Sequence, residues 1–104
     1  MNNVIEMFDK SPKYPKKKIR GTIYYTMDKY HPDYWYTLPV SDRDKVQEFS
    51  DTYMFDVNNP RSMQYGASME QMKAYIKHDL LMVAGGGYSA AHIHNIQIEY
   101  EVIS

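Results

Sequence analysis

The chain has no cysteine among its 104 residues. This absence excludes disulfide bonds, thiol nucleophiles and metal sites built on thiolates. No apolar run approaches the length of a membrane span, and the N-terminal residues lack the basic-then-apolar pattern of a signal peptide. We therefore expect a cytoplasmic protein that makes no contact with a membrane.

Motifs for phosphate binding and catalysis are also missing. Neither GxGxxG nor GxxxxGK[ST] occurs, and the Gly-Gly-Gly-Tyr-Ser run at residues 85–89 differs from the GxSxG elbow of hydrolases. Ser89 with His92 or His94 and an acid would form a nucleophile trio, but no recognised spacing supports it. Glu99 and Glu101 lie on the wet face of a predicted strand, where carboxylates make poor general acids. We expect a non-enzymatic protein with no catalytic residue and no cofactor.

Tyrosine and methionine are abundant, with eleven and eight residues. Both residue types are common at binding surfaces, because tyrosine is rigid and amphipathic and methionine re-packs easily. A small chain that is rich in these residues and lacks catalytic motifs is typical of phage or mobile-element accessory proteins. Such proteins bind and inhibit a host or partner protein. The densest aromatic stretch predicts the partner-binding residues, which are Tyr30, Tyr34, Trp35 and Tyr36.

The net charge of −1 hides an uneven distribution. Residues 1–20 carry a net charge of +4, and the remaining residues carry a net charge of −5. A basic cluster of this kind contacts nucleic-acid phosphates in many proteins, although it also serves as a solvated edge. An alternative function is therefore nucleic-acid binding through Lys13, Lys16, Lys17, Lys18 and Arg20.

A further alternative concerns the segment from residue 85 to residue 94. Successive glycine N–H groups can hold a phosphate, so a small ligand such as a nucleotide would contact Gly85, Gly86, Gly87, Tyr88 and Ser89. A His-x-His pair on a strand places both imidazoles on one face, as in some metal sites. His92 and His94 are therefore candidate metal ligands, although they supply only half of a zinc coordination shell.

Periodicity predicts an α+β fold with a small antiparallel sheet in ββααβ order and two helices on one face. The strands are expected at residues 19–28, 34–38 and 96–102, and the helices at residues 41–54 and 68–84. The alternation of the last strand breaks near Asn95, which indicates either a bulge or a strand that starts only there. Residues 19–104 would form one domain, preceded by a partly docked basic segment at residues 1–18.

The last strand is expected to pair with the first. The alternating pattern of this strand would also allow it to pair edge to edge with a second copy of the chain. A two-fold homodimer is therefore a further prediction.

Overall fold

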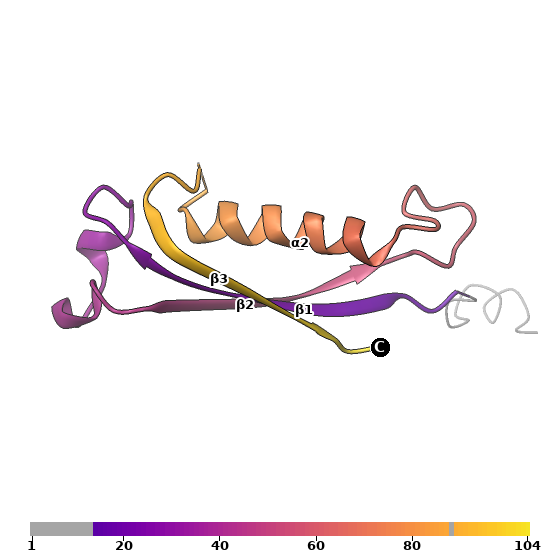
Figure 1. The fold of residues 1–104 in the computed structure, drawn as a ribbon, viewed down its shortest axis with the longest axis horizontal. Coiled ribbons are helices and arrows are strands. Elements are labelled where there is room, and N and C mark those ends of the chain that lie inside the picture. The colour runs from indigo at the N-terminus through magenta and orange to yellow at the C-terminus, as the bar shows by residue number, and fades with distance from the viewer. Residues whose placement is uncertain (1–13, 88) are drawn as a thin grey trace, which may run out of the picture.

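The computed structural model describes residues 14–87 and 89–104. Three antiparallel strands form one sheet in the order β2-β1-β3, and a single α-helix lies across one face of it (Figure 1). The elements along the chain are β1 (Lys17–Met27), the 3₁₀ helices η1 (Tyr34–Tyr36) and η2 (Val40–Asp42), β2 (Gln47–Phe55), α2 (Met69–Ala84) and β3 (Ile93–Val102). The α+β class and the antiparallel sheet are confirmed. The ββααβ order is wrong, because the described residues contain one α-helix in the order ββαβ.

β1 is the central strand, and its alternation decides which face is buried. Ile19, Ile23 and Met27 are buried, whereas the intervening Arg20, Thr22 and Tyr24 point to the other face. β1 pairs with β2 through Ile23 and Phe49 and with β3 through Ile23 and Ile98. The predicted pairing of the first and last strands is confirmed. β1 begins at Lys17, two residues before the predicted domain boundary.

α2 begins and ends where its capping residues predict. The Ser68 hydroxyl accepts a hydrogen bond from the Gln71 N–H, and the Gln71 side chain accepts one from the Ser68 N–H, which forms a capping box. The buried stripe of α2 consists of Met72, Ile76, Leu80 and Ala84. Gly21 of β1 lies directly beneath this stripe, and a Cβ there would stand 2.5 Å from the Ile76 Cγ2. The glycine therefore allows α2 to approach the sheet closely.

The predicted helix at residues 41–54 is wrong, because residues 47–55 form β2. Phe49 and Tyr53 are four residues apart, a spacing that fits one face of a helix and also one face of a strand. Phe55 continues the period of two, and Tyr53 and Phe55 are buried beneath α2. Ser41, expected as a helix N-cap, lies within the short η2.

The predicted strand at residues 34–38 is also wrong. Tyr34–Tyr36 forms a 3₁₀ turn, in which the Tyr36 N–H donates to the Asp33 oxygen. The Thr37 hydroxyl donates to the same oxygen at 2.8 Å. These local bonds satisfy the backbone, while both hydrogen-bonding edges of β1 are occupied by β2 and β3.

A β-bulge lies near Asn95, as one of the two sequence alternatives predicted. Thr26 pairs with His94 and Tyr24 pairs with Gln97, so two residues of β3 oppose one residue of β1. Asn95 has a φ of 55°, in the left-handed region that asparagine tolerates. The other alternative, a strand that begins after the irregularity, is wrong because β3 begins at Ile93. The bulge lets Ile93 and Ile98 both face α2.

Candidate functional site

Residues 29–46 connect β1 to β2 at one end of the sheet, and we call them the aromatic lobe (Figure 1). Three of the four predicted partner-binding residues are well exposed here: Tyr30, Trp35 at 58% and Tyr36 at 84%. Leu38, Val40 and Val46 add further exposed apolar side chains. The fourth predicted residue, Tyr34, is only partly exposed. A single connection between strands therefore presents six large exposed side chains.

Contacts within the aromatic lobe hold the Tyr34 and Trp35 rings in place. The Tyr34 and Trp35 rings meet edge to face, with their centroids 5.0 Å apart. The Arg43 guanidinium lies 4.8 Å from the Trp35 centroid and donates to the Trp35 carbonyl oxygen. The Trp35 indole N–H donates to the Lys29 oxygen at 2.9 Å. Trp35 is therefore held in place before any partner binds, which reduces the entropy lost on association.

Tyr34 contributes to the lobe through its hydroxyl. The hydroxyl donates to the Asp44 Oδ1 at 2.7 Å, and this bond to a carboxylate raises the pKa of Tyr34. The bond links the start of the lobe to the residues before β2. Tyr34 therefore supports its neighbours within the lobe.

His31 fastens the aromatic lobe to the body of the domain, with only 2% of the residue exposed. Its Nδ1 accepts from the Asp33 N–H at 3.0 Å, so the neutral ring carries its proton on Nε2. That Nε2–H donates to the Ala84 carbonyl oxygen at 2.6 Å, at the C-terminal end of α2. Sequence reasoning missed this role, because a single histidine beside Pro32 belongs to no spacing pattern.

His92 and His94, the candidate metal ligands, both contact Asp28 at the end of β1. The His94 Nε2 lies 2.8 Å from the Asp28 Oδ2, and the His92 Nδ1 lies 3.4 Å from the same oxygen. The Tyr30 N–H donates to the other carboxylate oxygen. These contacts, led by the His94 hydrogen bond, lower the pKa of Asp28 to about 2.

Each imidazole of this cluster gives one ring nitrogen to Asp28, the His92 Nδ1 and the His94 Nε2. Across residues 14–87 and 89–104, no group of three or more histidine or acidic side chains has the geometry to hold a metal ion. The cluster connects the start of the aromatic lobe to β3, since Asp28 precedes the lobe and His94 belongs to β3.

The Ser89 hydroxyl, considered above as a nucleophile, accepts a hydrogen bond from the Ala91 N–H at 3.3 Å.

The glycine run at residues 85–87 closes α2. The Gly87 N–H donates to the Met82 oxygen and the Gly86 N–H donates to the Val83 oxygen, which is the Schellman arrangement. Gly86 has a φ of 87°, and a Cβ there would meet the Pro32 ring of the aromatic lobe. The N–H groups that a phosphate would require are therefore bonded to helix carbonyls. Tyr88, also predicted as a ligand residue, lies outside the described residues.

The predicted nucleic-acid site is divided by the alternation of β1. Lys18 and Arg20 point to the open face of the sheet, and Lys17 points to the face of α2. Arg20 pairs with Glu101 at 3.6 Å, and both side chains are largely exposed. Lys16 is exposed, and Lys13 lies outside the described residues. The cluster thus shares its sheet face with acidic side chains.

Comparisons of the chain with protein-family models, with curated proteins and with solved structures gave no match. No α-helix within the described part of the chain is long and apolar enough to cross a membrane. The aromatic lobe is the largest group of exposed aromatic side chains along one connection of the described residues.

Proposed function

We propose that this protein is a non-enzymatic binding domain that contacts a protein partner through the aromatic lobe. The observation that carries the proposal is the exposure of Trp35 and Tyr36 on a connection whose internal bonds already fix its shape. Tryptophan and tyrosine are enriched among the energetic hot spots of protein interfaces, and the rim of such interfaces is polar. Lys29, Asp42 and Lys45 are charged residues of the same lobe.

The position of the lobe supports the same function. His31 and the Asp28 cluster connect it to α2 and β3, so the rings project from a rigid end of the sheet. Binding residues are commonly found on loops that a stable scaffold positions in this way. In this proposal the protein acts in the cytoplasm, as a phage-type accessory or inhibitor protein that occupies a surface of a host or partner protein.

The test is affinity capture from the lysate of the native host, with nuclease treatment in parallel. Wild-type protein and Trp35→Ser/Tyr36→Ser protein would be compared, and the captured partner would then be titrated against each purified form. We expect the double substitution to weaken the affinity at least tenfold, because hot-spot aromatics contribute about 2 kcal/mol or more each. Thermal unfolding would verify that the variant is folded.

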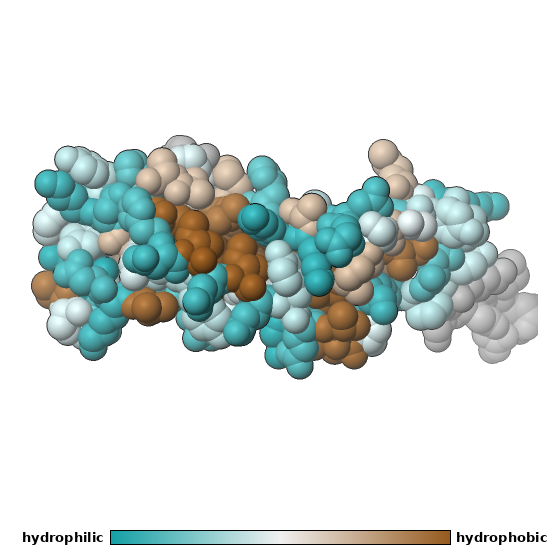
Figure 2. All heavy atoms as spheres, in the orientation of Figure 1, coloured by the Kyte–Doolittle hydropathy of each residue, from teal (hydrophilic) through white to brown (hydrophobic). Residues whose placement is uncertain are grey.

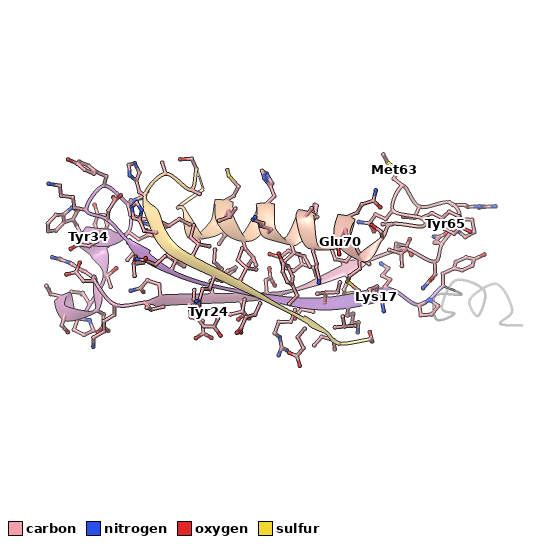
Figure 3. All side chains as sticks on the ribbon, in the orientation of Figure 1. Lys17, Tyr24, Tyr34, Met63, Tyr65 and Glu70 are labelled. Atoms are coloured by element: carbon pink, nitrogen blue, oxygen red, sulfur yellow. The ribbon has the colours of Figure 1, made fainter. Side chains whose placement is uncertain are left out.

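The opposite end of the molecule offers a matched control (Figure 3). Met63 and Tyr65 lie there on the connection from β2 to α2, and Tyr65 is 58% exposed, the same as Trp35. Met63→Ser/Tyr65→Ser should leave the affinity unchanged. Equal loss in both double variants, or retention of affinity in the Trp35→Ser/Tyr36→Ser protein, would contradict the proposal.

The nucleic-acid alternative stays a prediction with a separate test. Phosphate contacts release counterions, so binding through Lys16 and Lys18 would weaken steeply as salt concentration rises. A gel shift that is insensitive to salt would argue against this mode.

A further inference from the structure

β3 lies at the edge of the sheet, and its outer backbone groups have no partner strand among the described residues. The backbone N–H and oxygen of Lys18 bond to Ser104 and Ile103, which directly follow β3, so alternate β1 residues face β3. Arg20 and Thr22 continue this set and pair with Glu101 and Glu99. Because hydrogen bonding alternates along antiparallel strands, the intervening residues of β3 turn their N–H and C=O groups to the free edge. These residues are Ile96, Ile98, Tyr100 and Val102.

The same edge is lined by apolar side chains. A hollow of about 450 Å³ lies between α2 and β3, and its lining residues are Lys77, Leu81, Ile96, Ile98 and Tyr100. Figure 2 shows apolar atoms gathered where β3 passes beside the C-terminal half of α2. Ile96 is 40% exposed in this region. The free edge thus combines unpaired backbone groups with an apolar margin.

The other edge strand, β2, carries charges on both faces, so β3 is the edge better suited to pair with another strand. β2 carries Glu48 on the open face and Asp51 on the face of α2, and charges on an edge strand oppose pairing with another strand. On β3 the charges lie on the open face only. Glu99 accepts a hydrogen bond from the Tyr24 hydroxyl and Glu101 pairs with Arg20, so both are already engaged.

We infer that β3 pairs antiparallel with β3 of a second copy of the chain, about a two-fold axis at Ile98. In this register Ile98 lies opposite its own copy, and Ile96 lies opposite Tyr100 of the other chain. Glu99 lies opposite Gln97, so no two like charges are paired directly. The strand is therefore self-complementary, which a closed two-fold interface requires. The product is a six-stranded sheet with both copies of α2 on the same face.

This inference is independent of the proposed function, because it uses the edge of β3 and the binding proposal uses the aromatic lobe. The dimer would carry two aromatic lobes and could bind two partner molecules.

Light scattering and sedimentation of the full chain test the inference first. We expect twice the chain mass, falling to the chain mass on dilution. A monomer at every concentration up to the millimolar range would overturn it.

Charge substitution at the symmetry axis tests the register. Ile98→Lys places two ammonium groups side by side, so this variant should be monomeric, and so should Ile98→Glu. An equimolar mixture of the two variants should recover the dimer, because only this register places residue 98 opposite residue 98. Met54→Lys on the edge of β2 is the matched control and should remain dimeric.

Cross-linking covers the outcome in which the charged variants do not fold. The chain has no cysteine, so Ile98→Cys introduces a single thiol. Its Cα would lie about 5.5 Å from the same atom of the other chain, within the range of a disulfide bond. Mild oxidation should link this variant into covalent dimers, and Met54→Cys should stay unlinked. Cross-linking of the Met54→Cys variant in place of the Ile98→Cys variant would overturn the inference.

Discussion

β1 presents two sets of side chains, one to α2 and the other to a sheet face that no described element covers. Ile19 and Ile23 are fully buried on the first face. Thr22 and Tyr24 on the second face are partly exposed and bond to polar neighbours on β2 and β3, and Figure 3 shows Tyr24 pointing away from α2. Stability is therefore concentrated on one face.

The largest difference in unfolding free energy between the two faces is expected when neighbouring residues of β1 are truncated. Ile23→Ala removes a fully buried side chain from the core cluster and should cost about 2–5 kcal/mol of unfolding free energy. Thr22→Ala loses a hydrogen bond to the Ser50 hydroxyl on the open face and should cost about 1 kcal/mol or less. Urea unfolding measures both values. Equal losses would mean that the open face is covered in solution.

A smaller difference in unfolding free energy is expected between two Tyr→Phe substitutions, one on each face of the sheet. The buried Tyr53 hydroxyl donates to the Asp79 Oδ2 at 2.6 Å, and burial together with this carboxylate raises the pKa of Tyr53. Tyr53→Phe should cost about 1–2 kcal/mol, because it leaves a half-buried carboxylate without its donor. Tyr24→Phe, which removes a solvent-exposed bond to Glu99, should cost less than about 0.5 kcal/mol. Chemical denaturation of the two variants, side by side, makes the comparison.

The smallest expected effect is the contribution of the Asp28 carboxylate to stability, which depends on pH. The pKa of Asp28 is lowered from 3.8 to about 2, so its bonds to His94 and to the Tyr30 N–H stabilise the folded state above pH 3.8. This contribution is lost as the pH falls through about 2. Asp28→Asn should be less stable than the wild type at neutral pH, and the two stability curves should converge between pH 3.8 and about 2. Curves that stay parallel across this window would contradict the role of the carboxylate.

The sequence predicted the elements whose signals are local. The capping box at Ser68, the closure of α2 at Gly85 and the alternation of β1 each depend on a few neighbouring residues, and each is confirmed. An irregularity near Asn95 was predicted because regular alternation would have exposed Ile93, and of the two alternatives that the sequence left open, the bulge is the one present. These features need no knowledge of the tertiary contacts.

The errors occurred where tertiary contacts decide the outcome. Phe49 and Tyr53 fit both a helix and a strand, and the need of β1 for a partner strand selects the strand. The aromatic residues after Pro32 form a turn, because β3 occupies the position that a strand there would have taken. The anchoring role of His31 depends on the Ala84 carbonyl, which lies 53 residues away in the chain. No local pattern encodes such a contact.

The central place of β1 affects the order in which the protein can fold. One of its neighbours, β3, begins at Ile93, and Arg20 is paired with Glu101. The chain must therefore close a long loop before the sheet is complete, which slows folding in proteins with distant contacts. During synthesis, Ile19 and Ile23 have no partner strand on this side of β1 until β3 has left the ribosome. This interval is when the nascent chain is most exposed to aggregation or to a chaperone.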